Sequence, residues 1–298
     1  MQINYELLDQ LPTNNKVKIT PDTVKSLIMQ LSNNKAPEED CINNMALKHL
    51  PDNTINTLTN IIQAILKCAH YPATQKTAKI IPILKQHKPP GNPTSYRPIS
   101  LLNGTAKIIE KIIYKEIEQY LETNNLLNPN QHGFRKNYST TTQLKRIYST
   151  IIEAKANKKT TVTVMIDLEK AFDKVRHDIL IYKMLALKID PHTIKLIKSY
   201  LHQRSFFVYL NSAKSKLHIA ESGVPQGSCL GPLLFLIFIN DLKPSPSTNV
   251  KHFLYADDTA FISQHHKPSV AIRLATEELI RVTSYFTNFA MTINVAKT

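Results

Sequence analysis

The 298-residue sequence is poor in cysteine and lacks any long apolar run. Its three cysteines, Cys41, Cys68 and Cys229, lie far apart without a CxxC pair, which excludes both a zinc knuckle and a disulfide framework. The longest apolar run, LLFLIFI at 233–239, is too short to span a bilayer, and the first residues lack the pattern of a signal peptide. No GxxxxGK[ST] motif occurs, so a P-loop NTPase is unsupported. We therefore expect an intracellular protein without a membrane partner.

Acidic residues are also scarce relative to basic ones. The chain has 23 Asp and Glu against 37 Lys and Arg, which gives a formal net charge of +14. A basic balance of this size favours polyanionic partners, either nucleic acid or an anionic membrane surface. The alternative is that the extra lysines only keep the surface soluble. The hydrophobic fraction of 42% indicates a globular chain with a sizeable core, in one large domain or two ordinary ones.

Helices and strands are expected to interleave without a regular repeat. Apolar periodicity predicts helices over 20–31, 54–68, 105–124, 140–152, 177–202 with a break at Pro191, 229–242 and 269–289. Strands are expected over 161–166 and 206–210, and on both sides of a basic, proline-rich loop within 79–102. FLYADDTAFIS (253–263) is typical of a β-hairpin, and the polar stretch 32–53 carries no predicted element. This order predicts an α+β fold.

The predicted hairpin carries two adjacent carboxylates, Asp257 and Asp258, in an otherwise apolar or small setting. Burying two like charges side by side is costly, although aspartate is also common in ordinary turns. Asp167 ends the predicted strand 161–166, so three carboxylates converge if that strand lies beside the hairpin. Such a cluster calls for a cation, and hard oxygen ligands suit Mg²⁺. Two such ions about 4 Å apart can activate a 3′-hydroxyl and stabilise leaving pyrophosphate.

Six ordered blocks resemble the reverse transcriptases of non-LTR retrotransposons, in particular the jockey-like LINE group. They are YRPISLLNGTAKIIEKII (96–113), QHGFRKNYSTTTQL (131–144), VMIDLEKAFDKVRHDIL (164–180), SGVPQGSCLGPLLFLIFINDL (222–242), FLYADDTAFIS and INVAKT (293–298). The resemblance is strong over 66–298 and weak before that. It implies a right-hand polymerase with palm and fingers interleaved over 66–298, preceded by a helical extension over 1–65 and lacking a thumb.

The resemblance implies roles for residues around the carboxylates. Asp167, Asp257 and Asp258 match the metal-binding aspartates, and the backbone carbonyl of Leu168 matches a further metal ligand. Lys297 matches the lysine that protonates departing pyrophosphate, which is general acid catalysis.

Nucleotide-binding roles are implied for four more residues. Arg97 matches a fingers arginine that grips the triphosphate, a contact to which the planar guanidinium is suited. Phe172 matches the aromatic steric gate that favours deoxynucleotides, although ordinary core packing explains a phenylalanine equally well. Gln226 and Gly227 match the loop that contacts the incoming nucleotide and the template.

Template or primer contacts are implied for Gly223 and Pro225 in the same loop, for Tyr255 near the primer end, and for Arg135. Glycine suits a backbone that closely approaches a base pair. The alternatives are a helix N-terminal turn for the loop, core packing for Tyr255, and a buttress of the fingers for Arg135.

The function implied is that of an RNA-directed DNA polymerase that uses two Mg²⁺ ions, or Mn²⁺ in their place, with an RNA template, a DNA primer and dNTPs. The family's way of life places it in the nucleus and cytoplasm as a ribonucleoprotein. The alternative is a truncated, non-catalytic nucleic-acid-binding remnant, because APEEDCI (36–42) departs from a Gly-x-Asp-Gly run of the family and no thumb or endonuclease segment flanks the blocks. A viral RNA-dependent RNA polymerase shares the paired aspartates but is disfavoured by Phe172.

Overall fold

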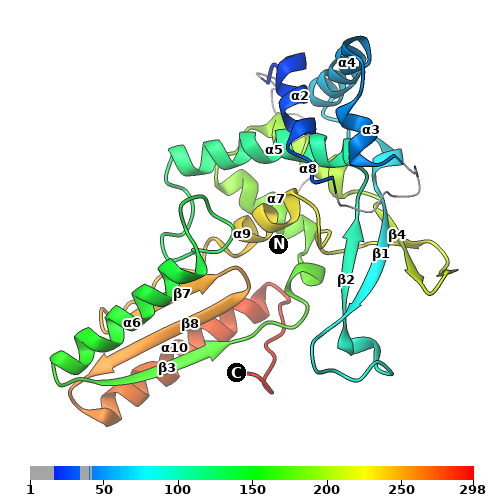
Figure 1. Ribbon diagram of the computed structural model, residues 1–298. Helices are drawn as coiled ribbons and strands as arrows, with labels where there is room; N and C mark the ends of the chain where they lie inside the picture. The colour runs from blue at the N-terminus through cyan, green and yellow to red at the C-terminus, as the bar shows by residue number, and fades with distance from the viewer. Residues whose placement is uncertain (1–16, 34–39, 41) are drawn as a thin grey trace.

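The computed structural model describes residues 17–33, 40 and 42–298, and the predicted helices are found there (Figure 1). They are α2 (Pro21–Met29), α4 (Asp52–Cys68), α5 (Gly104–Thr123), α6 (Thr140–Ala156), α7 (His177–Ala186), α8 (Pro191–Leu201), α9 (Leu230–Ile239) and α10 (Pro268–Asn288). Thr20 caps α2 as its sequence indicates, since the Thr20 side chain accepts a hydrogen bond from the amide of Thr23. An additional short helix, α3 (Asn44–Lys48), lies in the stretch for which no element was predicted. Of the divergent 36–42 motif, Glu38 and Cys41 lie outside the described residues.

The basic loop joins two strands of the first sheet. This sheet contains β1 (Thr77–Leu84), β2 (Tyr96–Leu101), β4 (Ser205–Leu210), β5 (Ala213–Lys214) and β6 (His218–Ile219). The strands follow the order β2-β1-β4-β5, with β6 also paired to β4. β1 and β2 form the predicted antiparallel pair, whereas β1 and β4 run parallel. The turn predicted at Asn211-Ser212 joins β4 to β5, and both residues have positive φ. We call this five-stranded unit the distal sheet.

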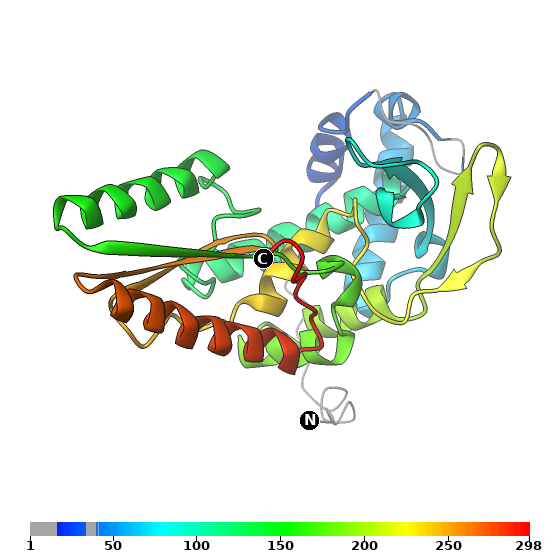
Figure 2. The same ribbon diagram turned by 90° about the horizontal axis from the view of Figure 1, so that it is seen from below.

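The second sheet contains β3 (Thr160–Ile166), β8 (Asp258–His265) and β7 (Val250–Tyr255), in the antiparallel order β3-β8-β7. The strand that precedes Asp167 therefore pairs with the hairpin strand that begins at Asp258, as the sequence analysis required. Figure 2 shows α6 and α10 on opposite faces of this sheet. Alternation along β3 turns Val162 and Val164 toward the core that α10 covers, and leaves Met165 exposed. We call this unit the central sheet.

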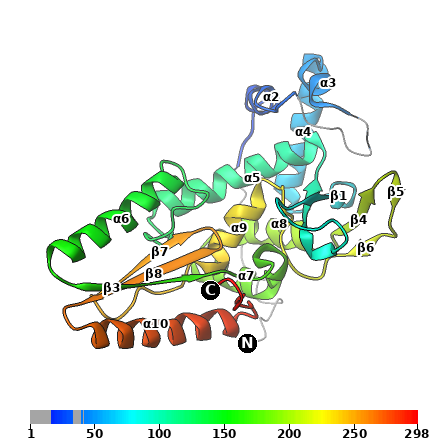
Figure 3. The same ribbon diagram turned by 60° about the horizontal axis from the view of Figure 1, so that its bottom comes forward.

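The helix α9 forms the middle of the core, between the central sheet and the helices α5, α7 and α8 (Figures 1 and 3). Each of its apolar residues is buried, which explains why its sequence is apolar on every face. Pro232 lies in its first turn, where a missing amide hydrogen costs no helical hydrogen bond. The buried helix predicted over 229–242 is confirmed over Leu230–Ile239.

The helices α2 and α4 belong to the same core as the rest of the chain. Leu27 and Ile62 are part of one continuous cluster of buried residues that reaches Phe261 in β8. The predicted division after residue 65 falls inside α4, three residues before its end at Cys68. In the described chain, no helix combines the length and apolarity that a membrane span requires. The arrangement is the predicted α+β fold.

Candidate active site at the β7–β8 turn

The turn between β7 and β8 carries the paired carboxylates. Tyr255 and Asp258 form the last residue pair of the ladder, so Ala256 and Asp257 make the connection between the strands. Ala256 is buried and has a φ of 54°, in the left-handed region that most side chains avoid. This tight connection places Asp257 and Asp258 at the end of the central sheet, next to the end of β3.

Asp167 follows the last residue of β3, and its carboxylate already has partners. Asn294 Nδ2 donates to Asp167 Oδ2 at 2.9 Å, and Lys297 Nζ lies 3.1 Å from the same oxygen. The Asp167 carbonyl also accepts a hydrogen bond from the Asn294 amide at 2.8 Å. The segment 292–298 thus returns from α10 to the active-site end of β3 and supplies the cation nearest to the carboxylates (Figure 2).

Burial and neighbouring negative charge raise the pKa values of Asp257 and Asp258. Burial raises the pKa of Asp257, the charge of Asp167 adds to that rise, and Lys297 opposes it. Partial burial also raises the pKa of Asp258, with further increases from Asp257 and then Asp167. A divalent cation would relieve this repulsion, and an all-carboxylate donor set suits Mg²⁺ in chemistry. Among the described residues, however, no three such side chains are already gathered in a metal-holding arrangement, because Asp167 faces Lys297 and Asn294.

The backbone of Leu168 lies beside the same segment, in an isolated antiparallel bridge with Ile293. The hydrogen bonds of that bridge use the carbonyl of Asp167 and the amide of Glu169, at 2.8 Å each. The Leu168 carbonyl takes part in neither of them, which is compatible with its predicted role as a ligand.

Phe172 lies in the short 3₁₀ turn η3 (Ala171–Lys174) that follows Asp167. Its ring stacks on Phe235 of α9 with centroids 4.7 Å apart, and Phe134 meets it edge-on at 6.3 Å. The side chain is only partly buried. Core packing is therefore realised at this position, and part of the side chain remains accessible.

The loop 222–228 lies between β6 and α9 in the chain, and it contacts both the turn η3 and the distal sheet. Gln226 donates from its side chain to Asp173 Oδ1 at 2.9 Å, and the Gln226 carbonyl accepts from the amide of Ser100 in β2 at 2.7 Å. Pro225 and its neighbours line a cavity of about 440 Å³ between this loop and β1, β2 and β4. Gln226 and Pro225 thus lie between the turn η3 and the distal sheet.

The glycines of this loop are required by contacts within the chain itself. Gly223 and Gly227 have φ values of 86° and 110°, where glycine is strongly preferred. A Cβ on Gly223 would lie 2.8 Å from the carbonyl oxygen of Asp173, and one on Gly227 would lie 2.6 Å from that of Ser100. Close approach to a base pair, the reason expected from the sequence, is therefore not needed to explain them.

Arg97 and Tyr255 lie in different sheets. Arg97 is exposed on β2, paired with Ile83 of β1. Tyr255 is half-buried and lines a second cavity, of about 470 Å³, together with Asp167, Asp258 and Lys297. The apolar walls of that cavity come from α6 and the central sheet. Because Asp167 and Asp258 are also among its lining residues, the cavity lies beside the carboxylates.

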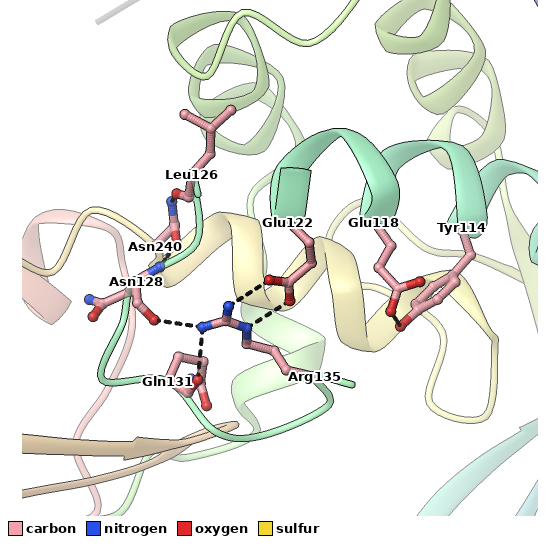
Figure 4. Close-up of polar contacts among 8 residues, drawn as sticks. All are labelled: Tyr114, Glu118, Glu122, Leu126, Asn128, Gln131, Arg135 and Asn240. Atoms are coloured by element: carbon pink, nitrogen blue, oxygen red, sulfur yellow. Dashed lines mark hydrogen bonds and ion pairs between the residues drawn. The ribbon is translucent and has the colours of Figure 1, made fainter. Parts of the chain in front are cut away.

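Arg135 is engaged within the protein (Figure 4). Its guanidinium forms a two-pronged ion pair with Glu122 of α5, at 2.8 and 2.6 Å, and it also donates to the carbonyls of Asn128 and Gln131. Only 8% of its side chain is exposed. These contacts favour the buttressing role over contact with the template.

Sequence reasoning missed two residues that touch this site. Asn294 binds Asp167, and Gln131 bonds the backbone of Ala256 in the turn. A signal for Gln131 was present in Gly133 of the QHGFR block, because a glycine between larger residues often marks a close backbone approach. No comparable signal pointed to Asn294.

Comparisons with known proteins agree with the geometry. The profile of the family described as "Reverse transcriptase (RNA-dependent DNA polymerase)" matches residues 83–298, which include all three aspartates. The RNA-directed DNA polymerase from the mobile element jockey of Drosophila melanogaster is 35% identical over 283 residues, covering 93% of this chain and 30% of that protein. A probable RNA-directed DNA polymerase from transposon X-element of the same species is 37% identical over 260 residues, covering 86% of this chain and 28% of its own length. The chain thus spans less than a third of these relatives.

Solved structures add support for the fold alone. Apo telomerase from Candida tropicalis matches with a TM-score of 0.54 at 13% identity, covering 81% of this chain and 48% of that one. A form of it truncated from the C-terminal domain matches with a TM-score of 0.52, covering 83% and 55%. The resemblance to jockey-like polymerases and the polymerase-like palm and fingers fold are confirmed. The chain belongs to the reverse transcriptase (RNA-dependent DNA polymerase) family.

Proposed function

We propose that the chain carries the RNA-directed DNA polymerase activity of a non-LTR retrotransposon, adding dNTPs to a primer 3′-hydroxyl on an RNA template. The observation that carries the proposal is the placement of Asp167, Asp257 and Asp258 at one end of the central sheet. The raised pKa values of Asp257 and Asp258 support a site that functions with a bound cation.

Two Mg²⁺ ions, with Mn²⁺ as a substitute, are the proposed cofactors. Asp167, Asp257 and Asp258 would hold them together with the carbonyl of Leu168. When bound, the ions supply activation of the attacking hydroxyl and stabilisation of the leaving oxygen. The side chain of Asp167 has to leave Lys297 or share its oxygens to take part, because the ion pair at 3.1 Å occupies Oδ2.

Nucleotide binding is assigned to β2, the turn η3 and the loop 222–228. Arg97, exposed on β2, is positioned to contact the triphosphate. Phe172 acts as the steric gate, and its stack on Phe235 holds the ring in place against a 2′-hydroxyl. Gln226 and Gly227 border the incoming nucleotide, in a loop held to β2 and to Asp173.

Contacts with the primer and template are assigned to Tyr255, Gly223 and Pro225, which border the two cavities at the site. We assign Arg135 to the support of the fingers, because its donors face Glu122 and backbone carbonyls. Lys297 remains our candidate for the general acid, since its ammonium group is near the carboxylates that face pyrophosphate.

The partners we propose are an RNA template and a DNA primer, consistent with the net charge of +14. Following the retrotransposon relatives, we propose action in the nucleus and cytoplasm as a ribonucleoprotein. The non-catalytic remnant is not favoured, because the family match runs through every predicted metal ligand.

The test is primer extension by the full chain on an RNA template, with Mg²⁺ and dNTPs. We expect Asp257→Ala to reduce extension by at least roughly a hundredfold, because a metal ligand is lost. Asp52→Ala is the matched control, since Asp52 makes only an exposed ion pair with Lys25. Equal extension by the parent and Asp257→Ala would sink the assignment of the site. Binding of an RNA–DNA hybrid without extension, under conditions in which a longer relative extends, would favour the remnant.

A further inference from the structure

We propose that Gln131 is a positioning residue for the catalytic carboxylates. Its side-chain amide fixes the backbone of Ala256, and thereby the direction in which the β7–β8 turn presents Asp257 and Asp258. The catalytic consequence of this inference rests on the proposed polymerase function, whereas the structural consequence does not.

The amide of Gln131 pairs with both backbone groups of one turn residue. Gln131 Oε1 accepts from the amide of Ala256 at 2.9 Å, and Gln131 Nε2 donates to the carbonyl of Ala256 at 3.2 Å. The same Oε1 accepts from the amide of Gly133 at 2.7 Å. Gln131 is only 3% exposed, so water cannot readily replace these bonds. Two bonds to opposite sides of one residue restrict its rotation more than a single bond would.

Ala256 needs such restraint because of its backbone conformation. Its φ of 54° lies in the left-handed region, which costs a residue other than glycine about 1 kcal/mol or more. Such conformations persist where the surroundings over-determine them. Asp257 is the next residue, so a change at Ala256 moves its carboxylate directly.

Gly133 lies against the backbone of Ala256, where there is no room for a side chain. A Cβ at this position would lie 2.2 Å from the amide nitrogen of Ala256 and 2.9 Å from its Cα. Those atoms are backbone and cannot move without shifting the turn. The glycine therefore permits the approach that brings Gln131 into range.

The segment that carries Gln131 is itself anchored to the palm. The amide of Leu254 in β7 donates to Asn130, and the amide of His132 donates to Leu254, so residues 130–132 extend the central sheet beyond β7. Figure 4 shows how the segment is held at its base: Arg135 joins Gln131 and Asn128 to Glu122, and Asn240 at the end of α9 bonds Asn128 and Leu126. The segment next to the turn is thus bonded to α5 and to the end of α9 as well as to β7.

A purely structural role is the rival explanation, and the chain offers a matched comparison for it. Gln143 in α6 is also buried, and it donates to the carbonyl of Asn130 on this segment and to that of Leu254 in β7, but not to Ala256. Gln143→Ala should therefore lower the melting temperature without displacing Asp257. Gln131→Met keeps approximately the volume of the side chain and removes its hydrogen bonds to Ala256. Gly133→Ala leaves Gln131 unchanged but adds a Cβ that would collide with the backbone of Ala256 and displace the turn.

The experiment measures these variants of the full chain in three ways: hydrogen exchange of the Ala256 amide, the rise in melting temperature caused by Mg²⁺, and single-nucleotide extension. For Gln131→Met and Gly133→Ala we expect exchange at Ala256 to be at least about tenfold faster. We expect kcat to fall roughly tenfold to hundredfold, as a displacement near 1 Å can cause, with KM for dNTP within about twofold of the parent. Gln143→Ala should keep parental exchange at Ala256 and parental kcat.

Parental exchange and parental kcat in Gln131→Met would overturn the inference, as would an equal loss of both in Gln143→Ala. If the parent extends no primer, the proposed function fails on its own. The inference then depends on exchange at Ala256 and on the response to Mg²⁺, and it is refuted if Gln131→Met leaves both unchanged.

Discussion

At the scale of single residues, the site gathers negative charge where the charge is unfavourable for folding. Burial and the neighbouring Asp167 raise the pKa of Asp257 above its usual 3.8. A carboxyl group whose pKa is raised by folding binds more protons in the folded chain than in the unfolded chain. Stability therefore falls as the pH rises from about 4 through the raised pKa, and the loss is complete above it. The metal-free protein is thus destabilised at neutral pH by the charge that the proposed metal site requires.

We predict that Asp257→Asn raises the melting temperature of the metal-free protein at about pH 7, by roughly 1–3 °C once solvent screening is allowed for. The gain should shrink toward about pH 4, where the parent carboxyl is also protonated. Thermal unfolding in a chelator measures it, with Asp52→Asn as the exposed control. A gain that is independent of pH would mean that repulsion among the carboxylates is not its cause.

Phe172 allows a second prediction at this scale, on the choice of sugar. Removing its ring should open space for a 2′-hydroxyl, so Phe172→Ala should increase the ratio of rNTP to dNTP incorporation by roughly tenfold or more. Phe134→Ala is the control, because it removes the neighbouring ring, 6.3 Å away between centroids, and leaves Phe172 itself in place. An unchanged ratio in Phe172→Ala would assign the residue to core packing against Phe235 and would revive the RNA polymerase alternative.

At the scale of elements, the loop 222–228 holds its shape because two glycines fit against neighbouring backbone. Gly227→Ala should destabilise the protein by about 1–3 kcal/mol, since the residue has a φ of 110° and its Cβ would meet the carbonyl of Ser100. Gly91→Ala is the matched control, because a Cβ there meets nothing within 4 Å. Urea unfolding compares the two, and equal stabilities would show that the loop shifts without cost.

The elements also show what a sequence can reveal. The buried helix α9, the β7–β8 hairpin and β3 were predictable, because apolar runs and β-branched alternation report local geometry directly. The helix α3 was missed, because five residues are too few to show a period. The parallel pairing of β1 with β4 was not predictable either, since it joins segments that are far apart in the chain.

The candidate site divides in the same way. Asp167, Asp257 and Asp258 could be singled out from the sequence, because burying charged residues at the ends of apolar strands is costly unless a partner compensates the charge. The partners of those residues were not, because Gln131 and Asn294 look like ordinary loop residues until the fold brings them to Ala256 and Asp167. The buried ion pair of Arg135 likewise depends on α5, which no spacing in the QHGFR block reveals.

At the scale of the whole molecule, the N-terminal helices and the polymerase blocks share one core. Leu27 of α2 is 1% exposed within the cluster that also contains α9, so Leu27→Ala should lower the free energy of unfolding of the whole chain by about 2–5 kcal/mol. Met29→Ala on the exposed face of the same helix should cost less than about 0.5 kcal/mol. Two separate unfolding transitions, with only the first affected, would instead establish an independent unit before residue 66.

The return of residues 292–298 to the end of β3 has a consequence for biosynthesis. A growing chain can pack α2, α4 and α5 together early, because these helices are close in sequence. Asp167 is made long before Asn294 and Lys297, so its carboxylate has neither of these partners while more than a hundred further residues are translated. The contacts of Asp167 in the candidate site therefore form only after residues 292–298 have been translated. A nascent chain arrested before residue 292 would hold folded helices and an open catalytic end.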